Sequence, residues 1–73
     1  MFRYPVIIEK ANGNYSAYSP DFPGCVATGK TIQKTLENIR SAIAFHIEGL
    51  KKERLPIPEP KTNVEYVEIT VPA

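Results

Sequence analysis

Apolar and polar residues alternate at the start of the chain. The large apolar side chains of residues 2–10 occur at every second position: Phe2, Tyr4, Val6 and Ile8. This spacing is typical of a strand with one face buried. Pro5 indicates an edge strand or a bulge, because proline cannot donate a ladder hydrogen bond. The pattern predicts a first strand over residues 2–10.

Asn12-Gly13 follows this segment and predicts a hairpin. An Asn-Gly pair between two strand-like segments favours a two-residue type I′ turn, in which both residues have positive φ. Residues 15–19 then form the returning strand. The register gives two cross-strand pairs on opposite faces: Ile8 with Ala17, and Ile7 with Tyr18.

The spacing changes after a loop at residues 20–24 and a predicted short third strand at residues 25–28. Apolar positions then recur at intervals of three and four: Ile32, Leu36, Ile39, Ile43, His46, Ile47 and Leu50. This stripe predicts an amphipathic helix over residues 32–53. Thr31 is the expected N-cap, and Pro56 prevents the helix from continuing.

Alternate prolines in residues 55–60 predict a stiff, extended connector. Residues 64–71 then alternate again, which predicts a last strand. The whole chain, residues 1–73, is therefore expected to be one α+β domain, a two-layer sandwich of order β-β-β-α-β. The helix covers one face of the sheet, and the other face has no layer of its own.

A chain of 73 residues buries only about 60% of its unfolded surface, so its core is small. Cys25 is the only cysteine and His46 the only histidine, which excludes an internal disulfide and a closed four-ligand zinc site. Oligomerisation, as a dimer or tetramer, is the expected remedy. Candidate interface residues are the following: Phe45, which points away from the helix stripe, and Ile7 and Tyr18 on the open sheet face.

No catalytic residue, metal or cofactor is expected. Cys25 and His46 could form a nucleophile–base pair, but they lie in separate elements and fit a buried thiol and a histidine beside the core. Asp21 is a single carboxylate that fits a turn. No apolar segment is long enough to cross a bilayer, and the net charge of +1 is not that of a typical nucleic-acid-binding domain. These observations indicate an interaction module rather than an enzyme.

Four segments together resemble one known family: Tyr4-Pro5-Val6-Ile7-Ile8-Glu9, Ser19-Pro20-Asp21-Phe22-Pro23-Gly24-Cys25, Asn38-Ile39-Arg40-Ser41-Ala42-Ile43, and His46-Ile47-Glu48-Gly49-Leu50 with the prolines that follow. Their order and spacing are similar to those of the HicB-like antitoxins of bacteria and archaea. The resemblance implies a partial RNase H-like fold in which the first strand is central, between the second and the last. A bulge at Pro5 is then favoured over an edge position. The clustered acids of a ribonuclease site are missing.

The resemblance also implies a partner, a small basic HicA-like toxin that cleaves mRNA, and therefore a cytoplasmic setting. The chain is expected to neutralise the toxin by masking its active surface. Candidate toxin-binding residues are Asp21, Glu9, Tyr18 and Phe22. Many members carry a C-terminal DNA-binding segment, but this chain ends at Ala73, so direct DNA binding is not expected.

Two alternatives stay open. The chain could be a homo-oligomeric regulatory module without a toxin. It could also be a single-stranded RNA-binding domain that stacks bases on its tyrosines. Co-purification with a basic protein would distinguish the toxin partner from the first alternative, and salt-sensitive RNA affinity would support the second.

Overall fold

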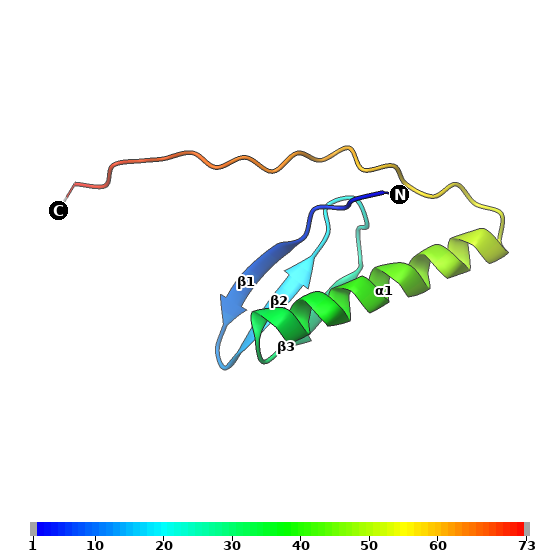
Figure 1. Cartoon of the computed structure of the whole chain (residues 1–73), viewed down its shortest axis with the longest axis horizontal. Helices are drawn as coiled ribbons and strands as arrows, with labels where there is room; N and C mark the ends of the chain where they lie inside the picture. The colour runs from blue at the N-terminus through cyan, green and yellow to red at the C-terminus, as the bar shows by residue number, and fades with distance from the viewer. Residues whose placement is uncertain (1, 73) are drawn as a thin grey trace.

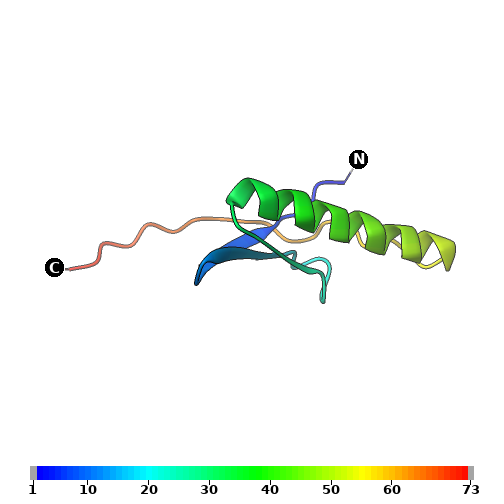
Figure 2. The same cartoon turned by 90° about the horizontal axis from the view of Figure 1, so that it is seen from below.

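Three antiparallel strands and one long helix form the folded body (Figure 1). The computed structural model describes residues 2–72. The elements are β1 (Ile7–Ala11), β2 (Asn14–Tyr18), β3 (Val26–Gly29) and α1 (Ile32–Lys52), and the sheet order is β1-β2-β3. Figure 2 shows α1 on one side of the sheet, with the opposite side uncovered. The α+β class and the single covering helix are therefore confirmed.

The hairpin has the predicted register but a different turn. Ile8 pairs with Ala17 and Ile7 with Tyr18. Gly13 has a φ of 76°, whereas Asn12 is not in the positive-φ region, so the turn has the φ signs of type II rather than the predicted type I′. Only the glycine occupies the left-handed region, where it has no Cβ to clash.

The first strand is shorter than predicted. It begins at Ile7, so Pro5 precedes the strand and makes neither a bulge nor an edge position within it. Proline lacks a backbone N–H, and the ladder starts only beyond it. The second and third strands lie within one residue of their predicted bounds.

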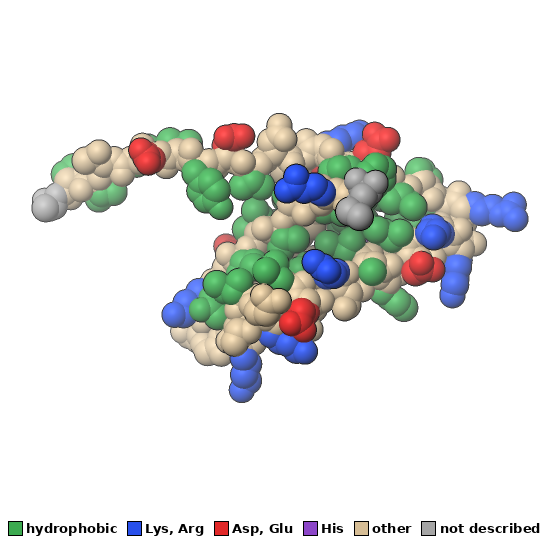
Figure 3. All heavy atoms as spheres, viewed as in Figure 1, with side chains coloured by type: hydrophobic (Ala, Val, Ile, Leu, Met, Phe, Trp, Pro, Cys, Tyr) green, Lys and Arg blue, Asp and Glu red, His purple; other side chains and the backbone are tan. Residues whose placement is uncertain are grey.

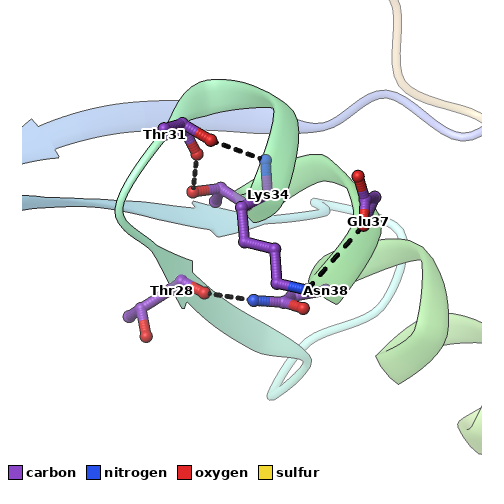
Figure 4. Close-up of polar contacts among 6 residues, drawn as sticks. Thr28, Thr31, Lys34, Glu37 and Asn38 are labelled. Atoms are coloured by element: carbon purple, nitrogen blue, oxygen red, sulfur yellow. Dashed lines mark hydrogen bonds and ion pairs between the residues drawn. The ribbon is translucent and has the colours of Figure 1, made fainter.

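The start of α1 is fixed by polar contacts (Figure 4). Thr31 is the N-cap, as predicted, and its Oγ1 accepts a hydrogen bond from the backbone N–H of Lys34 at 3.0 Å. The hydroxyl of Thr35 donates to the carbonyl of Thr31 at 2.7 Å. Asn38 Nδ2 donates to the carbonyl of Thr28 at 2.7 Å, which ties α1 to β3. Capping and tethering together set the angle at which the helix leaves the sheet.

The end of α1 has a Schellman geometry, one residue short of the predicted end. Leu55 N–H donates to the carbonyl of Leu50 at 2.9 Å, and Arg54 N–H donates to that of Lys51 at 3.1 Å. Arg54 takes the left-handed position, with a φ of 56°, that glycine usually occupies. The chain then turns back along the body toward the N-terminus (Figure 1).

The core lies between α1 and the middle of the sheet. Its buried apolar side chains are Ala17, Phe22, Ile39 and Ile43. The predicted helical stripe is buried only in part, because Ile32 is 51% exposed and Leu36 is 39% exposed. α1 packs chiefly on β3 and then on β2, so its apolar surface on the β1 side is left uncovered.

The predicted last strand is not part of the sheet. Residues 64–71 are extended but pair with no strand in the described part of the chain. β1 is therefore an edge strand, which corrects the expectation that it lies between two others. Alternation specifies an extended backbone and does not specify a partner within the chain. We call residues 55–62 the connector and residues 63–72 the arm.

Candidate partner-binding surface

The uncovered side of the sheet, which we call the open sheet face, carries an apolar row. Ile7 pairs with Tyr18, and Tyr18 pairs with Val26, so the three side chains lie next to one another across the strands. Tyr18 is 41% exposed and Val26 is 61% exposed. An exposed apolar row on a sheet without a covering layer is typical of an interaction surface.

A polar row follows the apolar one on the same face. It lies two residues along each strand from the apolar row. There Glu9 pairs with Ser16, and Ser16 pairs with Thr28. Glu9 is exposed. It carries the only charge among the strand positions of this face, and no lysine or arginine side chain of these three strands shares the face. The open sheet face therefore combines an apolar row with one free carboxylate.

Three candidates from the sequence meet on this face, namely Ile7, Glu9 and Tyr18. Sequence analysis did not single out Val26. The position of Val26 depends on how β3 pairs with β2. A long, proline-containing loop joins these strands, and its length does not determine their register as the length of a two-residue hairpin turn does. The period-two pattern of residues 25–28 is too short to indicate which side of the strand faces outward.

Asp21 lies elsewhere and contacts the connector. Its Oδ1 accepts hydrogen bonds from Lys61 N–H at 3.3 Å and from the Thr62 hydroxyl at 3.1 Å. Its Oδ2 is buried and has no hydrogen-bond partner among residues 2–72. A shielded carboxylate with one oxygen engaged is a poor surface for a cationic partner. Asp21 therefore serves to position the chain after the helix.

Phe22 is a core residue, which corrects the expectation that it lies on a binding surface. It is 2% exposed and packs edge-on against Tyr4, with ring centroids 4.6 Å apart. The ring of His46, on α1, also lies edge-on to Phe22, with the two ring centroids 5.8 Å apart. The loop that contains Phe22 folds under α1, which its proline and glycine content alone did not indicate.

Phe45 lies on α1, which covers the opposite side of the sheet from the open sheet face, and it is 83% exposed. It borders a shallow hollow near the end of the helix, together with His46, Gly49 and Leu50. Phe45 is thus separate from Ile7 and Tyr18, the other oligomer-interface candidates. Its part in an interface stays a prediction.

The four tyrosines do not share a face. Tyr18 lies on the open sheet face, Tyr15 lies on the helix side of β2, Tyr4 packs on Phe22, and Tyr66 lies on the arm. A stacking platform for RNA bases needs its aromatic rings on one surface. The arrangement does not favour the RNA-binding alternative.

Within residues 2–72, no group of three or more metal-ligating side chains comes together. No helix in that range is long and apolar enough to cross a membrane.

Tyr4 links the N-terminal segment to the connector through a titratable group. Its hydroxyl donates to the carbonyl of Pro58 at 2.6 Å. Partial burial, and then the nearby carboxylates of Asp21 and Glu59, raise the pKa of Tyr4 above its ordinary value of 10.0. Because the folded chain holds this proton more tightly than the unfolded chain, the Tyr4 contribution to stability is complete below the unfolded pKa. It is lost as the pH rises through the raised folded pKa.

We therefore expect the free energy of unfolding to fall above about pH 10, and part of this fall to be absent in Tyr4→Phe. The measurement is urea unfolding of both proteins on either side of that pH. Identical pH dependence of the two proteins would contradict the assignment to Tyr4.

The described residues thus form an α+β domain whose uncovered sheet face carries an exposed apolar row, a feature typical of interaction surfaces. The sequence profile of the HicB-like antitoxins of bacterial toxin-antitoxin systems matches residues 4–71. The chain belongs to this family.

The chain is also similar to curated relatives and to a solved structure. A UPF0150 protein of Thermoplasma acidophilum is 46% identical over 72 residues, which cover 97% of this chain and 99% of that protein. An uncharacterized 14.9 kDa protein of Haemophilus phage HP1 is 38% identical over 64 residues, which cover 88% of this chain. The chain spans about half, 48%, of the length of that phage protein.

A similar solved structure is a HicA3 and HicB3 toxin-antitoxin complex. The matched chain is 37% identical with a TM-score of 0.68, and the match covers 82% of this chain and 70% of that one. The resemblance seen in the sequence is thereby confirmed, and the protein has a role in a toxin-antitoxin system.

Proposed function

We propose that this chain is a HicB-like antitoxin that neutralises a HicA-type toxin by covering its active surface with the open sheet face. The observation that carries the proposal is the apolar row of Ile7, Tyr18 and Val26 beside the exposed carboxylate of Glu9. The solved structure that matches the chain contains HicA3 together with HicB3, which supports a partner of that class. Because the proposed target cleaves mRNA, the proposed setting is the cytoplasm.

The chemistry of the face fits a small basic partner. Burial of an apolar row against a partner stabilises the complex. A carboxylate at the border of the row can pair with a lysine or arginine of the partner and set the orientation of the complex. The absence of cationic side chains among the strand positions of this face removes a source of repulsion. The open sheet face therefore attracts a cationic surface that also exposes apolar groups.

The test uses a HicA-type toxin from the same genome, purified, with cleavage of an RNA substrate and binding affinity as readouts. The wild-type chain is expected to stop cleavage at a one-to-one ratio. Glu9→Lys and Tyr18→Lys are each expected to weaken binding by about tenfold or more, since each places a cation against a basic partner.

Glu48→Lys is the matched control, because it makes the same charge reversal on the exposed side of α1. Glu48 takes part only in a surface ion pair with Lys51 at 3.9 Å, so binding is expected to stay within about twofold of wild type. Full toxin activity in the presence of the wild-type chain would overturn the proposal. Equal weakening by Glu9→Lys and Glu48→Lys would overturn the choice of surface.

A further inference from the structure

The arm exposes apolar side chains and an unpaired backbone. Tyr66 is 92% exposed, Val67 80%, Ile69 73% and Val71 81%. Figure 3 shows the outer part of the arm standing clear of the body. A segment with strand-like alternation and free backbone groups gains from pairing with a sheet edge, through ladder hydrogen bonds and apolar burial. The arm therefore has the chemistry of a strand that lacks a partner among the described residues.

The body offers a matching vacant edge at β1. β1 is one of the two edge strands of the sheet, so alternate N–H and C=O groups along it are free to form a ladder. Beside the segment leading into β1 lies a groove of about 530 Å³. The groove is lined by Phe2, Tyr4 and Val6 before β1 and by residues of α1. The α1 residues are three apolar ones, Leu36, Ile39 and Ile43, and one cation, Arg40. Leu36 and Phe2 remain 39% and 50% exposed there, so the apolar surface under the β1 side of the helix lacks a covering element within residues 2–72.

The connector directs the arm away from its own body. Tyr4 donates a hydrogen bond to the carbonyl of Pro58, and Asp21 accepts hydrogen bonds from Lys61 and Thr62. The alternate prolines of the connector resist bending. Beyond Thr62 every described residue is exposed, and the arm projects past the end of the sheet in both Figure 1 and Figure 2. The long dimension of the molecule, 54 Å against 27 and 19 Å, reflects this extension.

We propose that two copies of this chain exchange their arms, so that residues 64–71 of one copy add to the β1 edge of the other as a fourth strand. One face of the arm carries Val67, Ile69 and Val71, together with Glu65. This face turns toward the groove of the second copy, where Arg40 is the cation that Glu65 can meet. Each copy gives one arm and accepts one, so the exchange closes on a dimer. The exchange is independent of the toxin and stands or falls apart from the proposed function.

The decisive measurement mixes two portions of the full chain, one enriched in heavy nitrogen and the other in heavy carbon, after joint unfolding and refolding. Isotope-filtered NMR then detects contacts only between copies. We expect such contacts between the methyl groups of Val67, Ile69 and Val71 and the backbone amides of β1. We also expect light scattering to give twice the mass of the 8.2-kDa chain.

A pair of lysine variants tests the face of the arm that is buried. Ile69→Lys places a charge toward the groove, and we expect it to weaken dimerisation by about tenfold or more. Thr70→Lys adds the same charge on the other face, and we expect the wild-type dimer. Both residues are exposed in the single chain, so the helical circular dichroism of the body should be preserved in both variants.

Three results would overturn the proposal. Arm-to-β1 contacts that appear in a sample enriched in both isotopes, and not in the mixed sample, would mean that the arm folds back on its own sheet. A monomeric wild-type chain without such contacts would mean that the arm has no strand partner. Equal effects of the two lysine variants would mean that the arm is not buried on the face we assign.

Discussion

Phe22→Ala is expected to lower the free energy of unfolding by about 3–5 kcal/mol. Phe22 is among the largest fully buried side chains and contacts rings from two other parts of the chain, Tyr4 and His46. Its removal leaves a cavity between the loop and α1. A core of this size supplies only about 3–5 kcal/mol in total, so the variant should be largely unfolded without denaturant.

Phe45→Ala is the matched control, since it removes the same side chain from a site that is 83% exposed. We expect a change within about 0.5 kcal/mol. Urea unfolding followed by circular dichroism, with all proteins at one concentration, measures both values. A small loss for Phe22→Ala would mean that the ring lies on the surface, as the sequence alone suggested.

Gly29→Ala is expected to destabilise the chain by about 1–3 kcal/mol. A Cβ at Gly29 would lie 2.6 Å from Thr35 Oγ1 and 2.7 Å from Thr35 N, and backbone atoms cannot move aside as a flexible side chain can. Thr35 is fully buried at the start of α1. The missing side chain of Gly29 is thus what allows the helix to begin so close to β3.

Gly49→Ala tests the same substitution in open space. A Cβ at Gly49 would meet nothing within 4 Å, and alanine favours the helix by about 1 kcal/mol over glycine. We therefore expect the opposite sign, a more stable protein, in the same unfolding experiment. Destabilisation by Gly49→Ala, or tolerance of Gly29→Ala, would contradict this account of the two sites.

Local rules succeeded where the determining contacts lie close in sequence. The two-residue loop at Asn12-Gly13 fixed the pairing of Ile8 with Ala17 and of Ile7 with Tyr18, although the turn type differed. The helix followed from its apolar spacing and the Thr31 cap. In each case the residues that decide the structure are neighbours along the chain.

Prediction failed where distant segments meet. The burial of Phe22 requires a proline-containing loop to fold under a helix that comes later in the chain. The burial of Thr35 depends on its close approach to Gly29, which no periodicity reveals. Residues 64–71 have a strand pattern, but the pattern does not specify which sheet edge, or which molecule, accepts them.

The order in which the elements pack has a consequence for the rate of folding. β1 packs on β2, β2 on β3, and β3 on α1, so most contacts in the body join segments that are neighbours along the chain. Contacts between elements that are neighbours along the chain favour fast folding, because little loop-closure entropy opposes each step. Collapse of the body should therefore be fast and independent of protein concentration. An association that pairs the arm with a second copy would follow as a separate bimolecular phase, slower at higher dilution.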